Sequence, residues 1–219
     1  MTVAAPFDPA CRRCHRLATF LDEVSRKHPD YFAAPIPSFG DPAAAFLVVG
    51  LAPGMHGANR TGRPFTGDHA GLLLYQSIFD AGFSNQPDGL DPADNLMLRN
   101  CRITNAVRCL PPSNKPMPEE MRQCNDYLLD ELTASQAPRV ILALGQIAHQ
   151  AVLHAYRLRL KDFPFGHGAR HELPSGQRLL DSYHCSRYNT QTRRLTPAMF
   201  AQVMNEARAL VEGDVAPAP

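Results

Sequence analysis

Long apolar runs are missing from this sequence of 219 residues. No segment approaches the length that a bilayer-spanning helix needs, and the N-terminus MTVAAPFDPA lacks the charged start and apolar core of a signal peptide. These absences disfavour membrane and secreted classes and predict a cytoplasmic protein without membrane contact. Because disulfides are rare in that reducing compartment, we expect the six cysteines to be ligands, catalytic groups or buried thiols.

Lysine is also scarce, since the chain contains only Lys27, Lys115 and Lys161, and none of them lies in the motifs described below. This disfavours a mechanism through a lysine nucleophile. The net charge is only +1, and such a sum says nothing about nucleic acid. The distribution of charged residues is more informative, because the segment between Asp181 and Glu206 contains arginines and no acidic residue. We expect the arginine-bearing segments to converge into a basic face that could hold phosphates, with scattered surface arginines as the alternative; the residues are Arg12, Arg13, Arg16, Arg60, Arg63, Arg187, Arg193 and Arg194.

The stretch from residue 45 to residue 79 organises the chain. Residues 45–49 (AFLVV) form an unbroken apolar run, as expected of a strand buried on both faces of a sheet. A long loop from Gly50 to Gly71 follows and holds five glycines before an apolar helix begins near Asp68, a candidate N-cap. Such a loop suits a place where a ligand approaches the backbone, and ligands of open α/β sheets bind at the carboxyl ends of the strands.

The other segments alternate between helix and strand. Asp8 and Pro9 predict a helix start, with the helix continuing to the residue before Pro29. Strands are predicted over residues 102–107, 139–144 and 178–183, and helices from 118, from 146 and from 197. This pattern predicts an α/β fold, a three-layer α/β/α sandwich with a mainly parallel central sheet. We expect one domain over residues 1–219, with loose tails at 1–10 and 213–219, and a monomer.

Four cysteines form a pattern. Cys11 and Cys14 make a C-x-x-C pair on the predicted first helix, where residues three apart share a face, and Cys109 and Cys124 lie far downstream near an adjacent strand and helix. Four thiolates suit a tetrahedral zinc ion or an iron-sulfur cluster, and the spacing does not separate the two. Buried thiols are the alternative for these four. Cys101 and Cys185 fit that alternative better.

Polar and aromatic residues follow the predicted strands at their carboxyl ends. Asp68 and Phe65 lie in the central loop, Asn105 ends the next strand, and His184 follows the last one. Residues at successive carboxyl ends converge on one crevice. Each has a plain alternative: Asp68 as a helix cap, Asn105 as a turn former, His184 as a core histidine and Phe65 as packing. Their joint placement favours a site.

Three motifs resemble those of the family 5 (type b) uracil-DNA glycosylases, which carry an iron-sulfur cluster. They are GLAPGMHGANRTGRPFTGD (residues 50–68), NAVRCLPP (105–112) and YHCSRYNTQTRRLTP (183–197). The resemblance implies the α/β/α fold of the uracil-DNA glycosylase superfamily and a 4Fe-4S cluster on Cys11, Cys14, Cys109 and Cys124. It also implies removal of uracil, and of other deaminated bases such as hypoxanthine and xanthine, from DNA in base excision repair.

The resemblance also implies residue roles. Asp68, His184 and Asn105 would be catalytic; the base would be held by Ala52, Phe65, Asn105 and His184; and the DNA would be contacted by Arg60, Arg187 and Tyr188, the last two in a loop after His184. Related cluster-bearing glycosylases place an acidic residue directly after the first glycine of the first motif. Here that residue is Leu51, as in the family 5 pattern, so the carboxylate role passes to Asp68 by the resemblance.

The residues support this assignment chemically. A glycosylase must hold a base outside the stack, for which Phe65 offers a ring and Asn105 an amide with both donor and acceptor. Asp68 could stabilise a sugar cation or orient water, and His184 could donate to a base carbonyl that gathers charge. Met55 and His69 are bulkier than the family pattern suggests and could narrow the pocket. The alternatives are a metal-stabilised nucleic-acid-binding module without catalysis and a redox iron-sulfur protein.

Overall fold

A six-stranded sheet forms the centre of the molecule. The computed structural model describes residues 6–213, and its strands lie in the order β1-β3-β2-β4-β6-β5. The inner strands β3 (Cys101–Asn105), β2 (Phe46–Gly50), β4 (Val140–Leu144) and β6 (Arg178–Ser182) run parallel to one another. The edge strands β1 (Phe39–Gly40) and β5 (Arg170–Glu172) run antiparallel to their neighbours. The mainly parallel sheet predicted from the sequence is confirmed.

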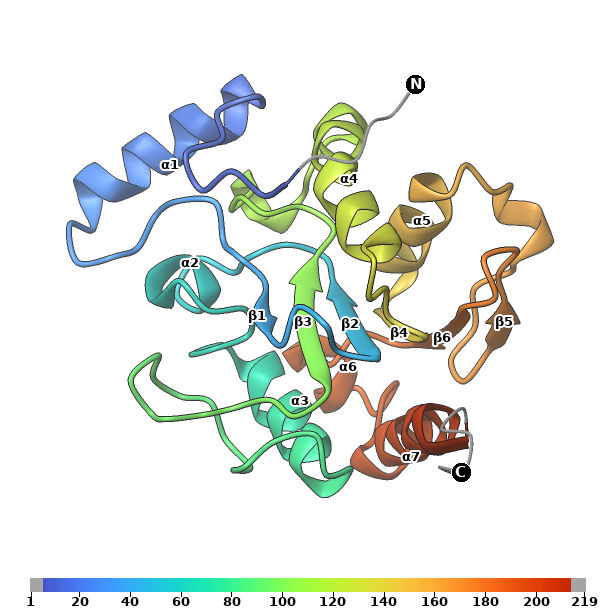
Figure 1. Cartoon of the computed structure of the whole chain (residues 1–219). Coiled ribbons are helices and arrows are strands. Elements are labelled where there is room, and N and C mark those ends of the chain that lie inside the picture. The colour runs from blue at the N-terminus through green and yellow to red at the C-terminus, as the bar shows by residue number, and fades with distance from the viewer. Residues whose placement is uncertain (1–5, 214–219) are drawn as a thin grey trace.

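Helices cover both faces of this sheet (Figure 1). On one face lie α3 (His69–Asp80) and α7 (Pro197–Gly213), and on the other α4 (Pro118–Thr133) and α5 (Gln146–Ala155). This arrangement confirms the three-layer α/β/α sandwich. None of the helices within residues 6–213 combines the length and the apolar character that crossing a bilayer requires.

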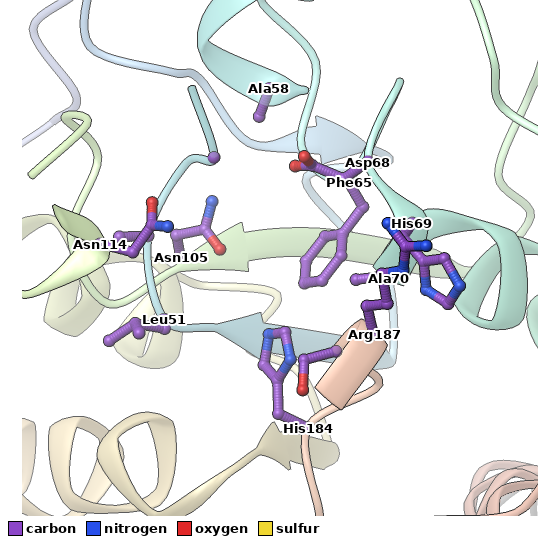
Figure 2. Close-up of a pocket in the computed structure, with 13 residues that line it drawn as sticks. Leu51, Ala58, Phe65, Asp68, His69, Ala70, Asn105, Asn114, His184 and Arg187 are labelled. Carbon is purple, nitrogen blue, oxygen red and sulfur yellow. The ribbon is translucent and has the colours of Figure 1, made fainter. Parts of the chain in front are cut away.

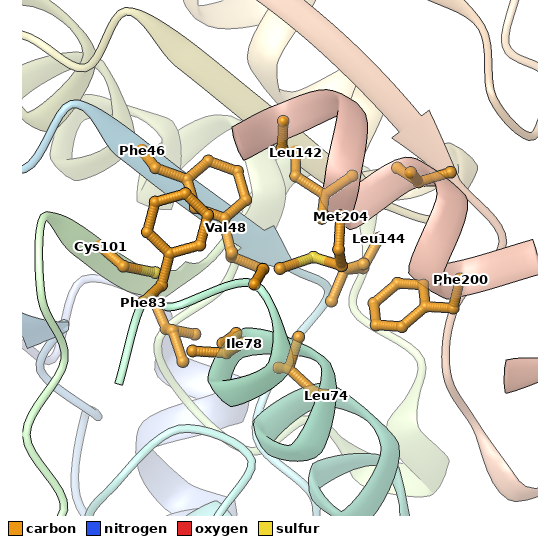
Figure 3. Packing of buried hydrophobic residues seen from close by; sticks show 14 of the residues in the cluster. Phe46, Val48, Leu74, Ile78, Phe83, Cys101, Leu142, Leu144, Phe200 and Met204 are labelled. Atoms are coloured by element: carbon orange, nitrogen blue, oxygen red, sulfur yellow. The ribbon is translucent and has the colours of Figure 1, made fainter. Parts of the chain in front are cut away.

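The alternation of side chains along β2 explains the two cores. Phe46 and Val48 point into the layer of α3 and α7, where Figure 3 shows them packed with Leu74 and Met204. Leu47 and its neighbour Val49 point into the opposite layer and pack under α4 and α5. All five residues of β2 are buried, as the unbroken apolar run predicted.

The first helix begins later than predicted. Asp8 and Pro9 form a turn, with the Cys11 backbone N–H donating to the Asp8 carbonyl at 3.1 Å, and α1 runs over His15–Lys27. The prediction that the C-x-x-C pair lies on a helix is therefore wrong: Cys14 is the N-cap of α1, and Cys11 precedes the helix. The Asp8-Pro9 pair satisfied the sequence rule for a helix start, but the Asp8 side chain accepts from the Ala10 backbone N–H and closes a turn. The expected tails fall partly on residues 1–5 and 214–219, which lie outside the described residues.

The basic face predicted from arginine clustering does not form as expected. Arginine side chains of the N-terminal segment and the central loop are paired with carboxylates: Arg12 with Asp22, Arg13 with Asp126, Arg16 with Glu120 and Arg63 with Asp94. Arg63 is also buried. Asp126, Glu120 and Asp94 lie far from their arginine partners in the sequence, so the clustering of arginines did not reveal these pairs. Arg60 and Arg187 remain exposed near the site described next.

Candidate active site

A cavity of about 510 Å³ opens at the carboxyl ends of β2, β3 and β6. Its volume falls in the range of small-molecule pockets. Figure 2 shows Asp68, Asn105, Phe65 and His184 arranged around it. The lining residues come from the central loop, the start of α3, the end of β3, the proline-rich loop after β3 and the segment after β6, and they are Leu51, Ala52, Gly54, Ala58, Phe65, Asp68, His69, Ala70, Asn105, Asn114, His184, Ser186 and Arg187.

Asp68 lies at the N-cap position of α3, but its side chain caps nothing in that helix. Its carboxylate is instead directed into the cavity beside Gly54, Gly57 and Ala58 (Figure 2). Burial raises the pKa of this carboxyl group, and the Ala58 backbone N–H opposes that shift. The alternative interpretation of Asp68 as a helix cap is therefore only partly correct. Its backbone occupies the N-cap position of α3, but its side chain does not cap the helix and lines the cavity.

Two glycines give this carboxylate its room. A Cβ atom added at Gly57 would lie 1.9 Å from Cγ of Asp68 and 2.0 Å from Oδ2, and one added at Gly54 would lie 2.8 Å from Oδ1. Any larger residue at position 57 must therefore move the carboxylate. The five glycines of the loop predicted a close approach, but the sequence did not show that the approaching group is Asp68.

We expect Gly57→Ala to lower the rate of the chemistry at this site by about 100-fold or more, because displacement of a reacting group by about 1 Å has a cost of that size. The single-turnover rate of the reaction that the sequence resemblance implies, release of uracil from DNA, measures the effect. Gly213→Ala is the matched control, since a Cβ there meets nothing within 4 Å. Unchanged excision by Gly57→Ala would contradict the placement of Asp68.

Asn105 and Phe65 both line the cavity next to Gly50, where an added Cβ would lie 2.4 Å from Oδ1 of Asn105. Asn105 ends β3 and is 3% exposed, and within residues 6–213 its side-chain amide makes no hydrogen bond, so donor and acceptor are both available. Phe65 has a positive φ of 59°, and its ring packs against Gly50, where an added Cβ would lie 2.7 Å from Cζ of that ring. A non-glycine residue in this conformation is uncommon and is held by its surroundings.

His184 follows β6, and its ring lies 6.1 Å from that of Phe65 with an angle of 27° between the two planes. Burial lowers the pKa of His184 to about 4, so the imidazole is neutral near pH 7. The Asn189 side chain donates to the His184 backbone carbonyl at 2.8 Å and holds this segment in place. His184 can therefore act as a neutral hydrogen-bond donor in the cavity.

The three residues expected to contact DNA are all exposed, and one of them lines the cavity. Arg60 is exposed and donates through Nε to the His56 carbonyl at 2.8 Å. Arg187 lines the cavity, and Tyr188 is 71% exposed. The prediction of a loop here is wrong: Arg187 and Tyr188 begin a short helix, α6 (Arg187–Gln191), for which Ser186 is the N-cap and accepts from the Asn189 backbone N–H at 3.4 Å.

The two bulky residues of the central loop behave differently. Met55 packs against Leu21, Val24 and Leu110, away from the cavity. His69 lines the cavity at the first position of α3 and is exposed. Only His69 can therefore narrow the entrance.

The four cysteines of the predicted ligand set line a second, small cavity between the N-terminal segment and α4. Burial and the neighbouring thiol and Glu120 charges raise the pKa of Cys14 to about 11, and the pKa of Cys109 is raised further by its burial. The Arg108 backbone N–H donates to Sγ of Cys124 at 3.2 Å. Cys101 and Cys185 lie apart in the hydrophobic core, as expected.

Comparison with known proteins agrees with this geometry. A model of the uracil DNA glycosylase superfamily matches residues 37–208, a span that contains the whole cavity lining. The chain belongs to the uracil-DNA glycosylase superfamily. Its relatives include the type-5 uracil-DNA glycosylase of Thermus thermophilus, which is 51% identical over 206 residues, 92% of this chain and 94% of the relative. The type-5 uracil-DNA glycosylase of Mycobacterium bovis is 43% identical over 91% of this chain and 78% of its own, and that of Pyrobaculum aerophilum is 39% identical over 91% and 88%.

Family membership accounts for the resemblance of the three motifs, and the structure brings them together. The first motif contributes Phe65 and Asp68, the second begins at Asn105, and the third carries His184. Sequence reasoning missed Ala58 and Asn114, which complete the glycosylase-like cavity. Asn114 lies in a short 3-10 helix (η1, Pro112–Asn114) within the proline-rich loop. The only sequence feature that pointed to a role in the cavity was the position of this loop directly after a predicted strand.

Proposed function

We propose that this protein is a monofunctional DNA glycosylase that hydrolyses the N-glycosidic bond of uracil, and of hypoxanthine and xanthine, in DNA during base excision repair. The observation that carries the proposal is the convergence of a buried carboxylate, an unbonded amide and an aromatic ring in one cavity: Asp68, Asn105 and Phe65. The names of the type-5 relatives support uracil as the first substrate.

Base recognition would rest on Asn105 and Phe65. A flipped base stacks on an aromatic ring and is read along its edge by hydrogen bonds. The Asn105 amide can donate to one edge atom and accept from its neighbour, which suits the carbonyl and imide N–H of uracil. Ala52 lies on the cavity wall and leaves space for the ring. Hypoxanthine and xanthine also present a carbonyl beside an N–H, so the same amide could read all three bases.

Bond cleavage would rest on Asp68 and His184. As the N-glycosidic bond breaks, positive charge develops on the sugar and negative charge on the base. The Asp68 carboxylate would stabilise the sugar cation or orient the attacking water, and the neutral His184 imidazole would donate to the carbonyl oxygen that gains charge. The cavity is partly closed from water, which strengthens both interactions.

The expected pH dependence follows from the proposal that Asp68 acts as an anion and His184 as a neutral imidazole. Excision should fall on the acid side as Asp68 takes up a proton, at a higher pH than for an exposed aspartate because burial raises its pKa. No step should appear near pH 6.5, where exposed histidines titrate, since burial lowers the pKa of His184 to about 4. Single-turnover rates from pH 4.5 to 8 test this. A step near pH 6.5 that His184→Asn abolishes would contradict the neutral imidazole.

DNA would be held at the cavity opening by Arg60, Arg187 and Tyr188. The two arginines could neutralise phosphates on either side of the flipped nucleotide. Tyr188 is the most exposed aromatic side chain described, and it stands one residue from the cavity lining. It could enter the duplex in place of the flipped base and offset part of the unstacking cost, although a contact with the backbone suits it equally.

The cysteine set fits a 4Fe-4S cluster, which we propose as a structural cofactor held by Cys11, Cys14, Cys109 and Cys124. All four side chains line one cavity. The pKa values of Cys14 and Cys109 are raised, so their thiolate forms are unfavourable without a nearby positive charge. A bound metal group would supply that charge. When bound, the group would tie the N-terminal segment to the loop after β3 and to α4.

The spacing of the sulfur atoms favours a cluster over a single zinc ion. Four thiolates around zinc, with Zn–S bonds of about 2.3 Å, bring the sulfurs to roughly 3.8 Å from one another. In the described part of the chain, the cysteines do not form a group of three ligand atoms that all lie within 4.8 Å. A larger polynuclear group suits such a spread better.

The experiment that tests the proposed function is excision from otherwise identical duplexes that carry uracil, hypoxanthine, xanthine or normal cytosine, read as alkali-labile abasic sites. We expect product from the deaminated bases and none from cytosine. Binding of the duplexes without any product, by protein with its full iron content, would instead favour a nucleic-acid-binding module.

A further inference from the structure

A cluster of three side chains lies outside the candidate active site and takes no part in it. His149 of α5, His171 of β5 and Asp181 of β6 each offer one ligand atom, and these atoms all lie within 4.8 Å of one another. Their side chains are 2%, 12% and 0% exposed. Figure 1 shows α5, β5 and β6 adjacent at one edge of the sheet. None of the three residues lines the cavity that holds Asp68.

Both ring nitrogens of His149 face acceptors. Nδ1 lies 2.8 Å from Oδ1 of Asp181, and Nε2 lies 2.9 Å from the backbone carbonyl of Phe163. A neutral imidazole carries one N–H, so it can satisfy only one of these acceptors. A hydrogen on each ring nitrogen, or a metal ion on the side of Asp181, would satisfy both acceptors.

His171 distinguishes these two possibilities. Its Nε2 is buried, makes no hydrogen bond among the described residues and lies 3.4 Å from Oδ2 of Asp181. Without a metal ion this nitrogen has only that long contact and no hydrogen bond, at a cost of about 1–3 kcal/mol for a buried polar group. A metal ion between the three residues would satisfy it together with the carboxylate.

We propose that His149, His171 and Asp181 bind a divalent transition-metal ion, with zinc as the best match. Two imidazole nitrogens and a carboxylate oxygen are a common ligand set for zinc, with bonds of about 2.0–2.2 Å. Ligand atoms around a tetrahedral ion with such bonds lie roughly 3.3 Å apart, close to the 3.4 Å between His171 and Asp181. The Nε2–H of His149 donates to Phe163, the outer-shell contact that fixes the tautomer of a metal-bound histidine.

The surroundings suit a structural ion. The rings of Phe163 and Phe165 pack edge-on against His171 and His149, with centroid distances of 5.8 and 5.6 Å. This apolar shell limits access of water. Binding would join α5 to both strands of the β5–β6 pair. Asp181 stands three residues before His184 on the same segment, so the ion would also brace the strand that leads to the proposed active site.

Zinc binding by the purified protein, with its cysteine-bound iron intact, tests the proposal. Zinc is titrated into wild type, His171→Ala and the control His154→Ala, each freed of loosely bound zinc by a mild chelator and checked to retain its iron; His154 is an exposed histidine on the same helix α5. We expect one zinc per chain in wild type and control, with X-ray absorption showing nitrogen and oxygen neighbours at about 2.0 Å. His171→Ala should bind zinc more weakly by well over about 100-fold, which exceeds the loss expected for an outer-shell contact.

Two results would overturn the proposal. One is zinc uptake by wild type no stronger than by His171→Ala, which leaves a protonated His149 paired with Asp181. The other is zinc with sulfur neighbours at about 2.3 Å, which would place it on the cysteines instead. His171→Asn serves as a second variant if removal of the ring impairs folding, and iron content confirms that each variant is intact. Neither result bears on the proposed glycosylase activity.

Discussion

Asp68→Asn is expected to lower the single-turnover rate of uracil excision by about 1,000-fold, within the range for loss of a charged catalytic group, while the affinity for DNA is retained. Asparagine has the size of aspartate and fits the space left by Gly54 and Gly57, so the loop should keep its conformation. What disappears is the negative charge beside the sugar. Excision is read as free uracil released, and affinity by anisotropy on an abasic-site duplex.

Asp80→Asn is the matched control, because Asp80 ends the same helix α3 on the exposed side and contacts only Gln76 among the described hydrogen bonds. Its excision rate should equal that of wild type. If Asp68→Asn retained a rate within tenfold of wild type, another group would have to carry the charge, and the proposed mechanism would be wrong.

Cys14→Ser is expected to abolish binding of the proposed iron-sulfur cluster and to lower the melting temperature by about 10 °C, the shift that several kcal/mol produce in a chain of this size. Cys14 is the N-cap of α1, where serine is a better cap than cysteine, so the helix itself should not suffer. The loss would therefore come from the cysteine-bound group. Iron content and visible absorbance measure the first effect, and thermal unfolding followed by circular dichroism measures the second.

Cys101→Ala is the control for this substitution. Cys101 is a buried thiol in the core next to β2 and does not line the cysteine cavity. It should lose some packing energy and keep its full iron content. Iron loss in Cys101→Ala, or full iron in Cys14→Ser, would contradict the assignment of ligands.

The strands and helices that form the core could be predicted because the pattern of apolar residues in their sequences matches the burial of those residues in the fold. The apolar run at residues 46–49 and the sequence VILAL of β4 occupy the centre of the sheet, where both faces are covered. Thr196 and Pro197 marked the start of α7, and Pro118 the start of α4. Asp68, Asn105 and His184 could be placed together because they follow strands whose carboxyl ends meet at one edge.

Other features depend on contacts that no local pattern reveals. The pairing of Arg13 with Asp126 joins residues far apart in the chain and offsets the charge of one arginine of the expected basic face. The close approach of the Asp68 carboxylate to Gly57 depends on the path of the whole central loop. Likewise, His149, His171 and Asp181 occur in three separate elements at spacings that match no metal-binding motif.

The central claim is that the target base enters the cavity between Phe65, Asn105 and Asp68. A crystal structure with a duplex that carries a 2′-fluoro-deoxyuridine, whose N-glycosidic bond resists cleavage, tests it directly. We expect the uracil ring stacked on Phe65, its edge hydrogen-bonded to the Asn105 amide, and its sugar beside the Asp68 carboxylate. A nucleotide that remains stacked in the duplex, or one that is flipped to a place outside this cavity, would contradict the account.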